Sequence, residues 1–160
     1  MTATIRFVPF SEADFHAWLI EAIPSFALTN VEDGRWTLAE SIEKSKDAHA
    51  ALLPEGVLTP GQFFVHLHDV ETDRRVGMMW WSEADKAGQR GAYVYNITIA
   101  EAERRRGHAR AAFVELERVA REGGVHHLGL HVFGHNHGAR RLYESLGFEP
   151  TSLTLRKILQ

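Results

Sequence analysis

The strongest constraint on the fold is the order of elements between Tyr93 and Phe133. Residues 93–99, Tyr-Val-Tyr-Asn-Ile-Thr-Ile, form the most strand-like stretch of the chain. A helix that stops at Gly123-Gly124 is predicted next, because apolar residues recur every three or four positions: Ala109, Ala112, Phe113, Leu116, Val119 and Ala120. A second strand is predicted at residues 128–133. This order predicts a parallel strand-helix-strand unit, which is a common place for a ligand.

The rest of the chain adds elements on both sides of that unit. We expect a strand at 4–8, a hairpin from strands 62–70 and 74–82, and a final strand at 153–159. Two helices are predicted to begin with capping boxes, Ser11 with Asp14 and Thr37 with Glu40. A last helix is closed by Gly147. Of Trp80 and Trp81, which alternate across a strand, one is expected in the core and one beside a substrate cleft. The fold class is α+β.

Length and composition narrow the class of protein. The chain has 160 residues, which fits a single domain over 1–160, and it contains no cysteine, so disulfides and thiolate chemistry are excluded. It contains no apolar run of about 18 residues, so we expect a cytoplasmic protein without membrane contact. Residues 1–103 hold 8 basic and 16 acidic side chains, whereas residues 104–160 hold 10 and 5. The acidic total of −3 argues against general nucleic-acid binding.

The segment Arg104-Arg105-Arg106-Gly107-His108-Ala109 lies between the strong strand and the strong helix. The first backbone N–H groups of a helix have no helical acceptor, so they can bind phosphate oxygens, and arginines add the counter-charge. Small residues such as Gly107 and Ala109 let the phosphates approach the main chain. The spacing matches neither a Walker loop nor a dinucleotide-binding glycine motif. The alternative is a solvated run of arginines in a loop.

A second motif runs from Asn136 to Phe148 with the spacing Asn-x-x-Ala-x-x-Leu-Tyr-x-x-x-Gly-Phe. Asn136 is a favourable helix N-cap, and Ala139 and Tyr143 share one helix face. Packing and helix termination explain Ala139, Leu142 and Gly147. They explain Tyr143 less well, because a buried hydroxyl needs a partner.

Together the two motifs resemble those of the GCN5-related N-acetyltransferase (GNAT) superfamily, and small bacterial acetyltransferases in particular. The resemblance is strong over residues 93–148 and elsewhere rests on element order. It implies a GNAT-like fold: a central mixed, mostly antiparallel sheet with a parallel strand-helix-strand unit and helices on both faces. It also implies that acetyl-CoA is the co-substrate and an amine the acceptor.

The resemblance assigns residues to acetyl-CoA. The pantetheine arm pairs like an extra strand with the backbone of Ile97, Thr98 and Ile99. Asn136 and Ala139 contact the cofactor from the second motif, and Tyr143 both contacts it and protonates the departing thiolate. The pyrophosphate lies on the helix start, where the implied cofactor-binding residues are Arg104, Arg105, Arg106, Gly107, His108, Ala109 and Arg110.

The general base does not follow the family pattern. Several family members use a glutamate on the strand before the arginine motif, but this chain offers Tyr93, Tyr95 and Asn96 there. Ribosomal-protein N-terminal acetyltransferases have a glutamate five residues before the motif asparagine, and His131 occupies that position here. A histidine can accept a proton near neutral pH. The alternative is a structural histidine on the strand 128–133.

The predicted function is transfer of an acetyl group from acetyl-CoA to a primary amine by direct attack in a ternary complex. The alternative is a non-catalytic acyl-CoA-binding module of the same fold. The ten histidines raise the question of a metal, but His66 and His68 lack a recognised zinc spacing, so no metal is predicted. The sequence leaves open which amine is the acceptor and which oligomeric state the protein adopts.

Overall fold

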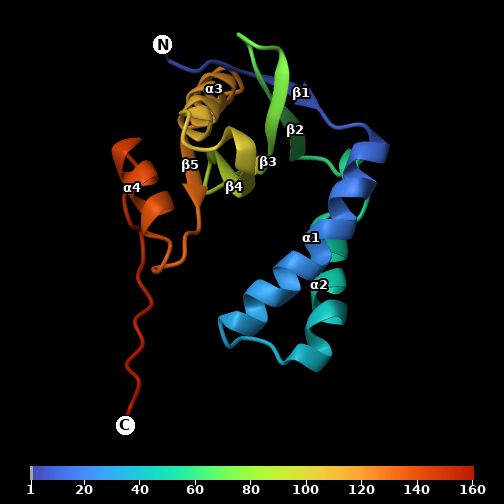
Figure 1. Cartoon of the computed structure of the whole chain (residues 1–160), viewed down its shortest axis with the longest axis vertical. Helices are drawn as coiled ribbons and strands as arrows, with labels where there is room; N and C mark the ends of the chain where they lie inside the picture. The colour runs from blue at the N-terminus through green and yellow to red at the C-terminus, as the bar shows by residue number, and fades with distance from the viewer. Residues whose placement is uncertain (1) are drawn as a thin grey trace. The chain divides into compact units, whose positions relative to one another are not determined.

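A computed structural model describes residues 2–160, which form two compact units. The first unit ends at Leu130 and the second extends from His131 to Gln160. Figure 1 labels the helices and strands of both. Within residues 2–160, no helix is long and apolar enough to cross a membrane. The single domain over 1–160 stays a prediction.

The elements follow the predicted order closely. The first unit contains β1 (Ile5–Pro9), α1 (Glu12–Glu32), α2 (Leu38–Leu52), η1 (Gly56–Leu58), β2 (Gln62–Asp69), β3 (Arg74–Lys86), β4 (Gln89–Ile99), η2 (Glu101–Glu103), α3 (His108–Glu122) and β5 (His127–Leu130). The second unit contains α4 (His137–Ser145).

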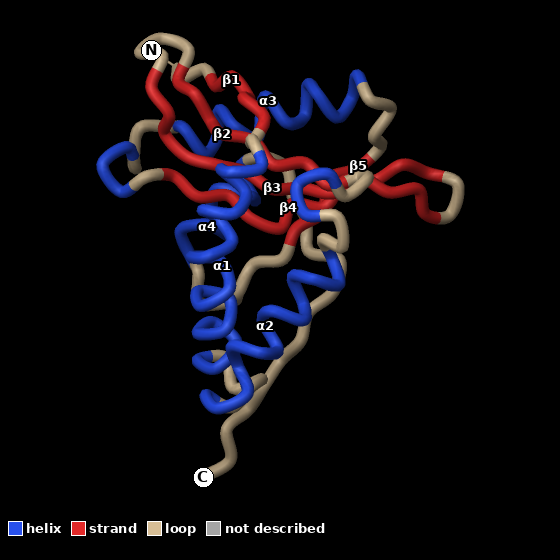
Figure 2. Tube along the Cα trace, turned by 90° about the vertical axis from the view of Figure 1, so that its right-hand side faces the viewer, coloured by secondary structure: helices blue, strands red, loops and turns tan. Residues whose placement is uncertain are grey.

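The first unit is built on a five-stranded sheet with the order β1-β2-β3-β4-β5. The first four strands pair antiparallel, and β5 pairs parallel with β4. Helix α3 connects β4 to β5, so the predicted parallel unit is confirmed. Figure 2 shows α3 on one side of this sheet and α1 and α2 on the other. The predicted α+β class with a mixed sheet is therefore confirmed.

Side chains cap the first two helices as predicted. At the start of α1, the Ser11 N–H donates to Asp14 Oδ2 at 2.9 Å, and the Asp14 N–H donates back to Ser11 Oγ at 3.1 Å. At the start of α2, the Thr37 N–H donates to Glu40 Oε1 at 3.0 Å. These bonds satisfy N–H groups that the helical ladder leaves without partners.

Aromatic side chains form the core between the sheet and α1. Phe15, Leu53, Phe64 and Trp80 are buried together there, and the rings of Phe64 and Trp80 stack at 5.0 Å. Trp81 points to the opposite face, where it stacks on Phe63. The predicted alternation is confirmed. Both tryptophans are buried, and the cleft position expected for one of them stays a prediction.

Strands β3 and β4 form a hairpin that the sequence did not predict, and both strands are longer than expected. Strand β3 continues past Ser82 to Lys86, and β4 begins at Gln89 rather than Tyr93. The two-residue turn is Ala87-Gly88, with φ of 52° and 77°. Two consecutive positive φ angles are what a tight hairpin turn with matching strand twist requires.

Two predicted strands at the C-terminal end differ from the structure. Strand β5 ends at Leu130, so His131, Val132 and Phe133 lie outside it. Residues 153–159 form no strand, and their large apolar side chains are exposed: Leu153, Leu155, Ile158 and Leu159. An alternating pattern becomes a stable strand only with a neighbouring strand to bond, and neither segment has a ladder in the sheet of the described residues.

Candidate functional site

Strand β4 changes its neighbours at Tyr95. Before it, residues 91–94 pair on one side with β3 and on the other with β5, ending at Val94 opposite Leu130. At Tyr95 the register with β3 shifts, because Trp81 pairs with Val94 whereas Trp80 pairs with Asn96. One residue inserted into one strand is a β-bulge, which bends the strand and ends regular pairing.

Past the bulge, the end of β4 is laddered to β3 alone. Ile97 pairs with Met79, Thr98 with Met78, and Ile99 with Gly77. The β5 ladder stops short of these residues, so one backbone edge of residues 97–99 faces away from the sheet. Such an edge can accept an extended ligand as an added strand. The residues predicted for the pantetheine arm thus occupy an edge with the chemistry that this role requires.

Gly77 lets β4 lie close to β3 at this edge. A Cβ atom built on Gly77 would collide with the carbonyl oxygen of Thr98. The glycine is required by this close approach of two backbones, since its φ is not among the positive ones.

Strand β4 leads through η2 into the arginine segment and then into α3. Arg105 has a φ of 64° and Gly107 a φ of 83°, both in the left-handed region. The ladder of α3 begins where the Ala111 N–H donates to the Gly107 oxygen at 3.0 Å. The N–H groups of His108, Ala109 and Arg110 lie ahead of it. A Cβ on Gly107 would meet no atom within 4 Å, so this start is open.

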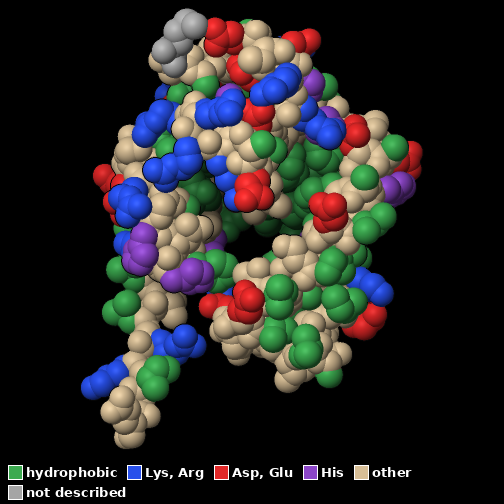
Figure 3. Space-filling view, viewed as in Figure 1, with side chains coloured by type: hydrophobic (Ala, Val, Ile, Leu, Met, Phe, Trp, Pro, Cys, Tyr) green, Lys and Arg blue, Asp and Glu red, His purple; other side chains and the backbone are tan. Residues whose placement is uncertain are grey.

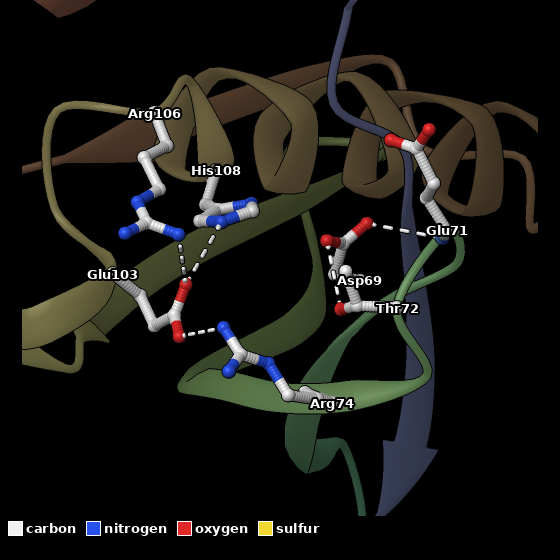
Figure 4. Close-up of polar contacts among 7 residues, drawn as sticks. All are labelled: Asp69, Glu71, Thr72, Arg74, Glu103, Arg106 and His108. Atoms are coloured by element: carbon white, nitrogen blue, oxygen red, sulfur yellow. Dashed lines mark hydrogen bonds and ion pairs between the residues drawn. The ribbon is translucent and has the colours of Figure 1, made fainter.

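A carboxylate organises the arginines around that start. Figure 4 shows Glu103 of η2 receiving Arg74 of β3, Arg106 and His108. Arg74 Nη2 bonds Glu103 Oε1, and Arg106 Nη1 lies 3.4 Å from Oε2. The buried His108 ring places Nε2 3.6 Å from Oε2. Glu103 therefore fixes the loop before any anion binds.

The turn that delivers Arg74 is held by its own carboxylate. Asp69 accepts from the Glu71 N–H at 3.1 Å and from the Thr72 hydroxyl at 3.0 Å, as Figure 4 shows. Asp69 is buried, and hydrogen bonds of this kind stabilise short turns. Arg74 is the first residue of the next strand, so the turn sets where its side chain begins.

The predicted phosphate-binding residues lie together at this start but face different ways. Arg105, Arg106, Gly107 and Arg110 are exposed, whereas His108 is buried with its ring toward Glu103. The Arg104 Nε donates to the carbonyl of Ile99 at 3.0 Å, which ties the arginine segment to the end of β4. His108 can therefore offer an anion its backbone N–H but not its ring.

The second unit holds the second motif. Asn136 is the N-cap of α4, and its Oδ1 accepts from the Ala139 N–H at 3.2 Å. The cap uses the amide oxygen, so the Nδ2 group is the part of this side chain suited to a ligand. Gly147, with a φ of 93°, follows the helix as its predicted stop.

Tyr143 lies on α4 with its ring edge-on to Phe148, at 5.8 Å between ring centroids. Burial raises the pKa of the Tyr143 phenol above its usual value. The phenol is therefore protonated at neutral pH and can donate a proton, which the predicted role as general acid requires.

His131 is the first residue of the second unit and is exposed. It falls within the strand predicted at 128–133, but β5 has already ended at Leu130. Its ring instead packs edge-on against Phe133, with ring centroids 4.9 Å apart. The predicted strand position of His131 is therefore wrong, and its role as base stays a prediction.

Two residues of the site, Glu103 and Arg74, were not predicted from the sequence. Glu103 directly precedes the arginines, and a carboxylate next to a basic run was a usable signal. Arg74 is 29 positions from Glu103, so its contribution depends on the pairing of β3 with β4. Within residues 2–160, no three His, Asp or Glu side chains are grouped to hold a metal ion.

The chain is similar to several known proteins. Residues 26–148 match the model of the acetyltransferase (GNAT) family. The chain is 33% identical to YdgE of Bacillus subtilis over 149 residues, covering 93% of this chain and 94% of YdgE. It is 32% identical to YycN of the same organism, covering 98% and 99%. Both are described as uncharacterized N-acetyltransferases.

Solved structures extend the comparison. The crystal structure of YycN matches with a TM-score of 0.89 over 98% of this chain and 99% of that one. An aminoglycoside 6'-N-acetyltransferase from Acinetobacter baumannii matches with a TM-score of 0.58 at 16% identity, over 98% of both chains. The latter likeness concerns the fold alone.

Proposed function

The chain belongs to the GNAT family and is an acetyl-CoA-dependent N-acetyltransferase, and from this premise we propose that it acetylates a primary amine by direct attack within a ternary complex. The observation that carries the proposal is the uncovered edge of β4 leading into the open start of α3. One element supplies a strand edge for an amide-bearing arm, and the next supplies N–H groups for a pyrophosphate.

Binding of the phosphates is supported by backbone geometry as well as by charge. Residues 105–107 include two left-handed positions, and turns of that kind point successive N–H groups into one concavity. The macrodipole of α3 adds partial positive charge at the same end. The Glu103 carboxylate contacts the side chains of Arg74, Arg106 and His108, and these contacts hold the loop in place without a ligand.

The chemistry requires no covalent intermediate on the enzyme. The amine nitrogen attacks the thioester carbonyl carbon, and the thiolate leaves with a proton from Tyr143. The protein's tasks are then to position the two substrates, to remove a proton from the acceptor ammonium and to stabilise the oxyanion. The raised pKa of Tyr143 supports its part as the acid.

The acceptor is proposed to be a cation before it reacts. Residues 1–103, which include α1, α2 and the hairpins, hold twice as many acidic as basic side chains. Such an excess attracts an ammonium group and adds little attraction for a nucleic acid.

The experiment is an assay of thiol release from acetyl-CoA over a panel of alkylamines, peptides and arylamines. We expect amine-dependent release by the wild-type protein, and a kcat about 100-fold lower for Tyr143→Phe with nearly unchanged acetyl-CoA binding. Calorimetry of CoA binding by Tyr143→Phe serves as the control that this variant is folded. Thiol release that never depends on an amine would refute the proposal.

His131 is tested in the same assay as the base predicted from the sequence. His131→Gln keeps hydrogen bonding and loses basicity, so the acid limb of the kcat/KM profile should disappear or move. Superimposable profiles would make His131 a structural residue.

A further inference from the structure

Outside the cofactor-binding segments, one buried imidazole has an unusual setting. His49 lies in the last turn of α2 and is 8% exposed. Three rings surround it, with centroids at 5.5 Å for Phe26, 5.9 Å for Trp18 and 6.4 Å for Trp80. They come from α1 and β3, and none of them can ionise. A histidine among aromatic rings is well packed but is not neutralised by a carboxylate.

Its hydrogen bond fixes which nitrogen carries the proton. Nδ1 of His49 lies 2.8 Å from the carbonyl oxygen of Ser45. A carbonyl oxygen can only accept, so Nδ1 must be the protonated nitrogen. In the neutral ring, the lone pair is therefore on Nε2. Among the described residues, two side-chain nitrogens are fully buried without a hydrogen-bond partner, Nδ1 of His68 and Nδ1 of His108. Nε2 of His49 is not one of them, so it is not shut off from a partner.

A single ring connects His49 to the bulge of β4. Trp80 contacts His49 and also stacks on Tyr95, with 4.4 Å between centroids and 21° between planes. Tyr95 is the bulge residue, beyond which β4 offers its uncovered edge. Trp80 itself pairs with Asn96, immediately before residues 97–99. The ring of Trp80 thus separates His49 from Tyr95, where the edge proposed for the pantetheine arm begins.

The same rings suit a cationic acceptor. Tyr93 and Tyr95 contact each other edge-on at 4.8 Å, and both are more than a third exposed. Figure 3 shows hydrophobic side chains set back in the recess between the sheet and α1. An ammonium group is attracted to the faces of tyrosine and tryptophan rings. Two rings stack on Trp80, those of Phe64 and Tyr95, and of these two only Tyr95 carries an ionisable group.

We propose that Nε2 of His49 is the general base that takes a proton from the acceptor ammonium, an inference that rests on the proposed acetyl transfer. The histidine becomes an imidazolium and the acceptor a neutral amine. The nitrogen lone pair then forms the C–N bond as the C–S bond breaks. The electron pair of the C–S bond leaves on sulfur, which takes the Tyr143 proton. The nitrogen's second proton restores Tyr143 through solvent, and the imidazolium releases its proton to solvent. The products are the amide, the CoA thiol and one proton.

The test compares two kinds of acceptor, of which only one must lose a proton before its nitrogen can attack. An alkylamine is protonated at neutral pH, whereas an arylamine is already neutral. For His49→Gln we expect kcat/KM to fall about 100-fold with the alkylamine, and to fall little with the arylamine. The loss with the alkylamine should shrink as the pH rises, because the free amine then forms in solution. His16→Gln, an exposed histidine on α1, is the matched control and should match wild type.

Each outcome decides one question. Equal losses with both acceptors mean that His49 is structural, and an unchanged alkylamine profile means that the base is elsewhere. If His49→Gln is unstable, His49→Ala with added imidazole replaces it, and a lack of rescue overturns the assignment. A wild-type protein that binds CoA but acetylates no amine refutes the proposed function itself, not the choice of His49.

Discussion

The helices α3 and α4 begin in opposite ways, although one of the two family motifs lies at the start of each. Helix α4 begins at Asn136, whose own side chain bonds the Ala139 N–H. Helix α3 begins at Gly107, which has no side chain to offer and adopts a left-handed conformation. Helix α1 resembles α4, since Ser11 Oγ accepts from the Asp14 N–H, and at the start of α2 the Glu40 side chain accepts from the Thr37 N–H.

The difference shows how one local problem receives two solutions. Every helix start exposes N–H groups that need acceptors. A polar side chain satisfies them permanently, whereas a glycine leaves them for a ligand. In this chain the start of α3 is also the one surrounded by arginines, which is why we propose that it binds the anion.

The largest effect is expected from closing the open start. Gly107→Glu adds a side chain and a negative charge where the phosphates are proposed to bind, and it forces a left-handed φ on a non-glycine residue. We expect the Kd for CoA to rise at least ~100-fold, measured by calorimetry.

The matched control lies at the other end of the same helix. Gly124 has a φ of 77° and also open space around a Cβ, so Gly124→Glu carries the same strain and charge. Its affinity for CoA should equal that of wild type. Equal affinities for both variants would break the contrast between open and capped starts.

A smaller effect is expected at the capped start of α4. Asn136→Asp keeps the oxygen that caps Ala139 but loses the amide donor, so stability should hold while the KM for acetyl-CoA rises about tenfold. Asn136→Ala removes the cap and should lower stability by about 1 kcal/mol. Steady-state kinetics and thermal unfolding separate the two roles. An unchanged KM for Asn136→Asp would leave Asn136 as a cap alone.

The smallest effect concerns the capped start of α1 and its pH dependence. The backbone hydrogen bond from Ser11, followed by His66, lowers the pKa of Asp14 to about 2 from its ordinary 3.8. A depressed pKa stabilises the folded state above pH 3.8, and this stabilisation is lost as the pH falls toward 2. The side chain is about a third exposed, so solvent screening leaves roughly 1 kcal/mol.

Asp14→Asn should therefore lower the Tm by about 2–4 °C at pH 6 and by progressively less toward pH 2. Lys46→Gln, which breaks an exposed pair with Glu43, is the control and should shift the Tm little at any pH. A Tm difference that does not depend on pH would contradict this explanation, because the effect would then not come from the charge of Asp14.

Local signals predicted those parts of the fold whose causes are local. Ser11 with Asp14 and the Gly123-Gly124 stop lie within a few residues of the structure they determine. The helix start proposed to bind phosphate could be located in the sequence for the same reason, since the strand, the arginines, the glycine and the helix follow one another directly. The turn at Ala87-Gly88 was missed because alanine in a left-handed conformation is not a usual turn signal.

Features that depend on distant partners were not readable. The bulge at Tyr95 depends on how β4 pairs with β3, which the sequence of β4 alone does not show. The β5 ladder ends near the same place, although strand-forming residues continue to Phe133. Arg74 reaches Glu103 across two strands. His49 looked like an ordinary helix residue until α1 and β3 packed around it.

The close approach at Gly77 constrains how this lineage can change. Any single-codon missense mutation of a glycine introduces a Cβ, and there it would meet the Thr98 carbonyl. Strand β4 would have to move outward at the edge proposed to hold the cofactor. No substitution of Gly77 is therefore expected to be neutral. In a library that contains all twenty residues at position 77, the active clones should all carry glycine.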